Sequence, residues 1–138
     1  NLQFPFAVGH SLYNTVEFNR LRYVGLRTDD LGALSVFSGS GNHSVLSMQS
    51  VLRYNSVCDV VGELSYGVYL DNCASGWLVQ GNLIMRTGSV SILVHSGSNN
   101  DIRDNVFVLS SSGYHRGHIR IAKTANLSCG CENNSFTQ

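Results

Sequence analysis

Residues 66–88 read YGVYLDNCASGWLVQGNLIMRTG, and residues 89–108 read SVSILVHSGSNNDIRDNVFV. The two segments share one order of features: a short alternating apolar run, a small polar turn, and a second short run that ends at Asn82 or Asn105. The unit returns after 23 or 24 residues. Apolar residues at every second position indicate β-strands. A unit that returns at a regular interval indicates a solenoid, in which each unit buries its apolar face against the next.

The asparagine that closes this unit recurs along the chain, with an apolar residue three positions before it or two positions after it. An amide side chain at a sharp corner can bond backbone groups and tolerate a left-handed conformation, and stacked asparagines can bond one another as a ladder. Residues 53–65 are expected to form a longer connection between units. We expect the corner to be marked by Asn19, Gln49, Asn82, Asn105 and Asn134, with spacings of 30, 33, 23 and 29 residues.

The pattern excludes a helical fold. No window has apolar residues at i, i+3, i+4 and i+7 without interruption by Gly or Asn-Gly. Charged residues make up only 13% of the chain, which contains 14 Gly and one Pro, and this composition suits short strands joined by small polar turns. We therefore predict an all-β fold, a right-handed parallel β-helix (solenoid) of about five coils. It would form a single domain over residues 1–138, which is either complete or a fragment of a longer solenoid.

The chain resembles the right-handed parallel β-helix repeat proteins of the pectate-lyase-like superfamily. The resemblance is closest over residues 66–108, where residues 66–76 are similar to the family's GIYLDxxxSG run. Residues 94–107 follow the same recurrent pattern, and residues 14–25 and 29–33 are similar to earlier coils. Many members act on polysaccharides as lyases, glycosidases or epimerases, and others are adhesins or fibre proteins. The resemblance therefore implies either a carbohydrate-active protein or a structural module.

Charge and cysteine content limit the partners and the location. Nine Lys and Arg balance nine Asp and Glu, so the chain lacks the basic surface that nucleic acid or an anionic membrane requires. No apolar run approaches the roughly 18 residues of a membrane span. An even number of cysteines and three glycosylation sequons favour a secreted protein in an oxidising setting. The sequons begin at Asn42, Asn126 and Asn133; the cysteines are Cys58, Cys73, Cys129 and Cys131, and their pairing stays open.

Stacking in the proposed register would align outward side chains in columns across neighbouring coils. Adjacent parallel strands lie about 4.8 Å apart, so Asp71 and His95 would be neighbours. The expected columns are Phe37–Asp71–His95–Ala122, Ser35–Tyr69–Leu93–Arg120 and Ala33–Gly67–Ser91–His118.

These columns suggest a carbohydrate cleft. Asp71 would serve as acid/base or nucleophile with His95 as its partner. Glycoside hydrolysis requires two carboxyl groups, and the second would come by way of a loop from Asp29, Asp30 or Glu63. A lyase would instead use His95 as base, with Arg120 neutralising a uronate.

Other side chains would contact the substrate. We expect Arg120 or His118 to bind an anionic or hydroxyl-rich ring, and Tyr69 or Trp77 to offer a stacking face, although Trp77 also suits a packing role. No metal or organic cofactor is expected. The competing explanation is that Asp71 and His95 are an exposed cross-strand pair, worth up to about 1 kcal/mol.

Two further functions remain open at this level. Open ends of a parallel stack offer unpaired backbone groups to another chain, and a head-to-tail contact that does not close produces a filament. The chain would then be an assembly module that self-associates through its ends. Alternatively, it would bind glycans without cleaving them.

Overall fold

The computed structural model describes residues 6–8, 13–37, 50–108, 117–127 and 129–138. These residues form fourteen strands in three sheets and no helix. Sheet A contains β1 (Phe6–Val8), β4 (Leu31–Phe37), β7 (Ser65–Asp71), β10 (Ile92–His95) and β13 (Ile119–Ala122). Sheet B contains β2 (Thr15–Glu17), β5 (Ser50–Arg53), β8 (Trp77–Gln80), β11 (Asp101–Arg103) and β14 (Ser135–Thr137). Sheet C contains β3 (Arg20–Val24), β6 (Ser56–Val60), β9 (Leu83–Thr87) and β12 (Val106–Val108).

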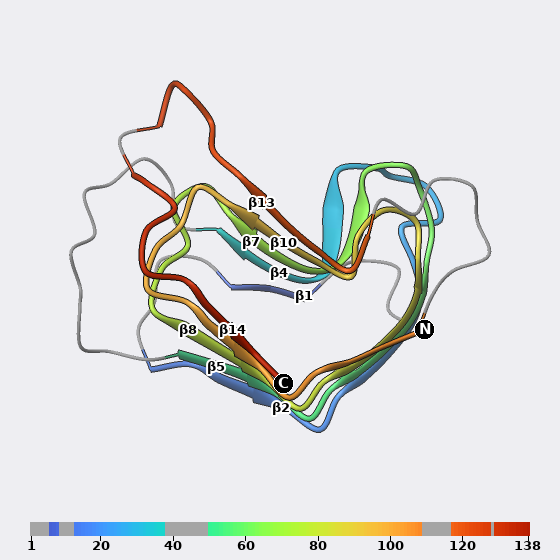
Figure 1. The fold of residues 1–138 in the computed structure, drawn as a ribbon. Coiled ribbons are helices and arrows are strands. Elements are labelled where there is room, and N and C mark those ends of the chain that lie inside the picture. Colours follow the sequence, from blue (N-terminus) through green and yellow to red (C-terminus); the bar gives the residue numbers. More distant parts are fainter. Residues whose placement is uncertain (1–5, 9–12, 38–49, 109–116, 128) are drawn as a thin grey trace.

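The chain visits the three sheets in a fixed order, from A to B to C and back to A. Every pairing is parallel and joins strands one circuit apart, so that an inner strand has a partner on each side and an end strand has one. The strands of each sheet therefore lie side by side, as Figure 1 shows for β4, β7 and β10 and for β2, β5 and β8. The described chain is all-β with stacked parallel sheets, an arrangement compatible with the predicted parallel β-helix.

The register of sheet A agrees with the expected columns. Tyr69 pairs with Ser35 on one side and with Leu93 on the other. Phe37 pairs with Asp71, and further along the sheet His95 pairs with Ala122 and Leu93 with Arg120. The alternation of the strands thus sets which side chains share the outer face.

Alternate residues of the inner strands fill the main core. Among the side chains expected to point inward, Val68, Leu70 and Ile92 have no exposed surface. Trp77 is also buried in this core, which confirms its packing role. Ile119 and Ile121 were expected inside but are 36% and 48% exposed, because no described strand of sheet A lies beyond β13.

A ladder of asparagine amides marks the corner between sheets B and C. Asn55 donates from its backbone N–H and from Nδ2 to Oδ1 of Asn82, both at 3.0 Å. Asn82 bonds Asn105 in the same way, also at 3.0 Å. In Asn55, Asn82 and Asn105, Nδ2 also donates to a strand carbonyl of the preceding circuit, as Asn82 does to Leu52 at 2.9 Å. The ladder thus pairs backbone groups at a corner, where two consecutive strands of the chain meet and the sheets are interrupted.

Two of the predicted ladder positions were wrong. Asn55 occupies the place between Asn19 and Asn82, whereas Gln49 lies outside the described residues. Asn134 belongs to a different corner, between sheets A and B, where its Oδ1 accepts from Asn100 N–H at 3.1 Å.

The expectation of a connection at residues 53–65 is also wrong, since β6 lies within it. Leu52 stands three residues before Asn55, and Val57 stands two residues after it. The ladder pattern was therefore present in the sequence at this position.

The ladder asparagine was expected to adopt the left-handed conformation. The structure instead places this conformation at the residue before each asparagine. At successive circuits φ is 57° for Phe18, 55° for Tyr54, 64° for Gly81 and 54° for Asp104. A residue with a side chain pays roughly 1–2 kcal/mol for this conformation. The repeated hydrogen bonds of the neighbouring asparagine offset that cost.

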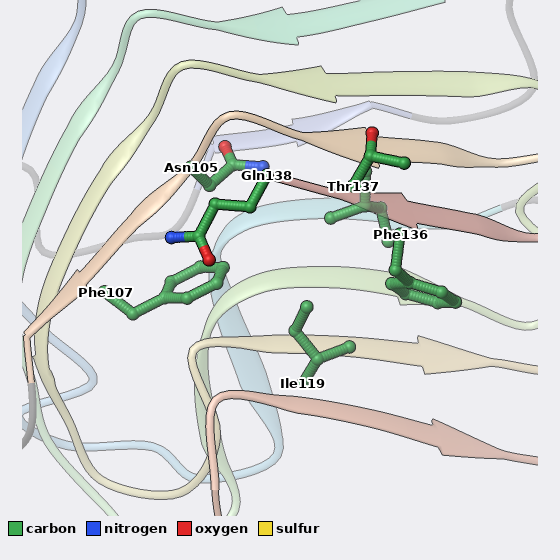
Figure 2. Close-up of a pocket in the computed structure, with 7 residues that line it drawn as sticks. Asn105, Phe107, Ile119, Phe136, Thr137 and Gln138 are labelled. Atoms are coloured by element: carbon green, nitrogen blue, oxygen red, sulfur yellow. The ribbon is translucent and has the colours of Figure 1, made fainter.

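The last described strands leave a hollow at one end of the stack, shown in Figure 2. Its volume is about 190 Å³, and it lies between β11, β12, β13 and β14. Its apolar walls include Phe107, Ile119 and Phe136. The hollow is the exposed continuation of the core, since these side chains pack on the final circuit.

Asn82→Ala should strongly destabilise the fold. The change removes the acceptor of two Asn55 hydrogen bonds and the side-chain donor to the Leu52 carbonyl. The Asn105 amide oxygen loses one of its two donors and keeps the backbone N–H of residue 82. Buried unpaired polar groups cost about 1–3 kcal/mol each, so we expect a loss of roughly 2–4 kcal/mol in the free energy of unfolding, measured by urea denaturation. Asn19→Ala, at the exposed end of the ladder, is the control and should cost under about 1 kcal/mol. Equal losses in the two variants would contradict the ladder's role.

Candidate functional site

Asp71 and His95 lie side by side on the outer face of sheet A. They are the last residues of β7 and β10, and Oδ1 of Asp71 is 2.8 Å from Nδ1 of His95. Their side chains are 18% and 27% exposed, so both are shielded yet accessible. The N–H of Asn72 also donates to Asp71 Oδ1 at 2.8 Å, which orients the carboxylate. The expected neighbourhood is confirmed, and the catalytic roles stay predictions.

A buried phenol joins this pair to a second carboxylate. The hydroxyl of Tyr69 lies 3.5 Å from Asp30 Oδ1 and 3.5 Å from His95 Nδ1, at the long limit of hydrogen bonding. Burial, then the nearby charges of Asp71 and Asp30, raise the pKa of Tyr69 above its usual value. The phenol therefore stays neutral and can donate a hydrogen bond.

The structure distinguishes between the three acids that the sequence offered as a second carboxyl group. Asp30 is the one in contact with Tyr69. Asp29 instead accepts from the N–H of Leu64 at 2.9 Å and from the Ser65 hydroxyl at 3.1 Å, and so fixes a turn. Glu63 is exposed on that same turn.

A small apolar cluster, separate from the main core, surrounds the phenol. Tyr66, Tyr69, Val90 and Leu93 are buried together, with Ala122 packed against them. The rings of Tyr66 and Tyr69 meet edge to face, with centroids 4.8 Å apart. This cluster lies on one side of the Tyr69 hydroxyl and its polar neighbours. It lowers the local dielectric there and so strengthens the interactions between the charged groups.

Thr124 is the residue of this site that sequence reasoning missed. Its hydroxyl contacts Nε2 of His95, so both ring nitrogens of the histidine are engaged. Thr124 follows β13 by two residues, and its N–H donates to the Ser96 hydroxyl at 2.8 Å. A threonine in a loop has no periodicity or motif, so no sequence signal could have placed it beside His95.

A disulfide ties the two sides of the site together. Cys73, two residues after Asp71, is bonded to Cys129, five residues after Thr124. Cys58 and Cys131 are free thiols. The bond links circuits that are not adjacent in the stack, and it secures the loop containing Thr124 against the turn that follows β7.

Two of the three predicted substrate-binding residues, Arg120 and His118, occupy different places from each other. Arg120 is exposed and pairs with Leu93, so it lies on the same face in the column that contains Tyr69. His118 stacks on Phe107 with centroids 5.3 Å apart. It precedes Ala122 by four residues, which is about 13 Å along a strand, so the structure places it near the end hollow and away from His95.

The structure describes two of the three predicted glycosylation sites. Asn126 and Asn133 are exposed, and Asn42 lies outside the described residues. Nδ2 of Asn133 lies 3.4 Å from Oδ1 of Asn99. Both described asparagines are accessible at the surface, and their glycosylation stays a prediction.

Within the described ranges, no three His, Cys, Asp or Glu side chains are grouped to hold a metal ion. The same residues contain no helix that is long and apolar enough to cross a membrane.

A second polar cluster lies on sheet C around Asp59. Arg86 Nε donates to Asp59 Oδ1 at 2.6 Å, and Arg22 Nη2 donates to Oδ2 at 3.2 Å. The Arg86 hydrogen bond, foremost, holds the pKa of Asp59 well below its usual range. Burial raises the pKa of the adjacent Cys58 thiol, so this thiol stays protonated and is a poor nucleophile. The cluster is best explained as an ion-pair network that links three strands.

Comparison with known proteins returned no counterpart: no protein-family model, curated protein or solved structure matches the chain. Any function must therefore be argued from the site itself.

Asp59→Asn should reduce stability at neutral pH and reduce it by a smaller amount in acid. A carboxyl group whose pKa is lowered by folding stabilises the protein fully above its unfolded pKa of about 3.9, and this contribution is lost as the pH falls towards the folded value. Both arginines are partly exposed, at 39% and 47%, so we expect only about 1 kcal/mol at pH 7. Urea denaturation of both proteins at pH 7 and near pH 2.5 measures the difference. A difference that does not shrink in acid would contradict this assignment.

Proposed function

We propose that this chain is a right-handed parallel β-helix that acts on polysaccharides outside the cell, with Asp71 and His95 as its acid–base pair. The main support is the 2.8 Å contact between Asp71 Oδ1 and His95 Nδ1, half-buried on the outer face of a parallel sheet. Partly buried titratable groups arranged in this way are candidates for catalysis.

The neighbouring groups suit a hydroxyl-rich substrate. Asp30 and Asp71 provide two carboxylates near the neutral Tyr69 hydroxyl, and glycoside hydrolysis requires a pair of carboxyl groups. Arg120, exposed on the same face, could pair with the carboxylate of a uronate. The substrate would lie across the ends of β7 and β10, where these groups meet.

The disulfide and the surface sequons support a secreted protein. A disulfide persists in oxidising compartments, and Cys73–Cys129 is adjacent to the site. Asn126 and Asn133 are exposed where a glycan could be attached.

Asp71→Asn and His95→Ala should each abolish turnover of a responsive glycan while the fold is retained. Loss of a positioned acid or base typically costs 10²–10⁴-fold in rate, so we expect at least about a 100-fold loss in kcat/KM. The wild-type protein would first be assayed on neutral and acidic polysaccharides, by reducing ends and by ultraviolet absorbance of unsaturated uronates. Asp104→Asn, at a corner away from sheet A, is the matched control and should retain full activity. Unchanged turnover in both site variants would refute the proposal.

A second candidate function is self-association through the hollow end of the stack. Val106, Val108 and Ile121 are 56%, 44% and 48% exposed on the last strands. Exposed strand edges with apolar side chains favour the addition of another chain. A second copy, stacked through the other end of its sheets, would cover these side chains.

Ile121→Lys should prevent this assembly because the lysine would place a charge in the apolar contact. We expect wild-type protein to elute at a larger size as its concentration rises in gel filtration, and the variant to remain monomeric. Leu26→Lys changes another exposed apolar residue, in a turn between sheets C and A, and should behave as wild type. A wild-type protein that stays monomeric at every concentration rules out the assembly function.

A further inference from the structure

We propose that Thr124 is the nucleophile of an Asp71–His95–Thr124 triad that removes acyl groups from esterified polysaccharides. The inference rests on the carbohydrate-directed function proposed above and specifies its reaction. It is based on two contacts of the His95 ring: Nδ1 contacts the Asp71 carboxylate, and Nε2 contacts the Thr124 hydroxyl.

The hydrogen bonds determine which nitrogen of His95 carries the proton. Asp71 Oδ1 lies 2.8 Å from Nδ1, and an ionised carboxylate only accepts hydrogen bonds. Nδ1 is therefore the donor, and Nε2 of the neutral ring must be an acceptor. The Thr124 hydroxyl that contacts Nε2 is then the donor. This is the arrangement by which a carboxylate-oriented histidine activates a hydroxyl nucleophile.

Thr124 is held in this position from several directions. Its N–H donates to the hydroxyl of Ser96, which is fully buried, and its carbonyl accepts from Leu127 N–H at 3.2 Å. The disulfide between Cys73 and Cys129 restrains the same loop. A hydroxyl positioned by its own backbone and by a crosslink loses little freedom on reaction, which favours catalysis.

The surroundings of Thr124 suit a hydrated substrate with short acyl groups. Lys123, Ala125 and Asn126 are exposed beside it, and they are small or polar. The His95 side chain is 27% exposed, so solvent and substrate can reach the pair. An O-acetylated glycan presents both the hydroxyl-rich chain and the small ester that such a surface would accept.

The reaction balances without a cofactor. Thr124 Oγ1 attacks the ester carbonyl carbon as its proton moves to His95 Nε2, and Asp71 stabilises the imidazolium that forms. The sugar oxygen leaves and takes the proton from Nε2, which gives a deacylated glycan and an acyl-threonine. Water then attacks the acyl group with His95 as base, and the carboxylic acid and free Thr124 are released.

A purely structural role for Thr124 makes a different prediction. If the hydroxyl served only as a hydrogen-bond partner of His95 Nε2, its removal would change the stability of the protein or the orientation of the histidine. It would not remove a covalent intermediate, because none would form on Thr124. Serine keeps the hydroxyl, whereas valine keeps the branched shape without it. The pair Thr124→Ser and Thr124→Val therefore separates nucleophile from support.

The test measures release of acetate from an O-acetylated polysaccharide, with p-nitrophenyl acetate as a small probe. We expect Thr124→Val to lose at least about 100-fold in kcat, with little change in KM or melting temperature, and Thr124→Ser to retain activity. A fluorophosphonate probe should label the peptide containing residue 124 in wild-type protein, and mass spectrometry should find no label in Thr124→Val.

The outcomes are distinguishable from those of the proposed function. Full ester hydrolysis by folded Thr124→Val, or labelling at another residue, overturns the triad. Cleavage of glycan chains without any ester hydrolysis overturns the triad but leaves the carbohydrate-directed function standing. No turnover of any ester or glycan overturns both.

Discussion

The hydrogen bond from one asparagine amide to the next is the interaction on which this structure depends. At each B–C corner the chain turns through a left-handed residue. The following asparagine bonds an adjacent circuit, and at the inner corners, Asn55 and Asn82, it bonds the circuits before and after it. The corner thereby satisfies backbone groups that no strand could pair, and burying them unpaired would cost more than the turn gains. Because the ladder aligns successive corners, the strands that leave those corners are also aligned, and the apolar face of one circuit covers the next.

The site follows from that alignment. Residues that end two neighbouring strands of sheet A must lie about one strand spacing apart, which is why Asp71 reaches His95. The groups that complete the site come from outside the stacked strands. Asp30 precedes sheet A strand β4, and Thr124 follows β13. A regular scaffold thus positions the central pair, and irregular segments supply the chemistry around it.

Regular strands and irregular corners also differ in how far the sequence predicts them. Alternation and the repeat predicted the outer columns through Asp71 and His95, because side-chain direction in a strand is set by position alone. The wrong assignments fell where the repeat length varied. Asn55 was overlooked because the unit before it was counted as ending at Gln49, and Asn134 was placed at a corner one strand too late. Variation in corner length shifts the spacing of asparagines without changing the strands, so spacing is a weaker guide than the local apolar pattern.

The amino-acid sequence by itself determined the all-β class, the period of the strands and the neighbourhood of residues 71 and 95, because these depend on local patterns that repeat. Only the tertiary structure decided that Cys73 joins Cys129, that Asp30 rather than Asp29 approaches Tyr69, and that Thr124 contacts His95. These contacts are made by turns and loops whose paths depend on the packed stack as a whole. No repeat constrains such paths, so their contacts cannot be read from the spacing of residues along the chain.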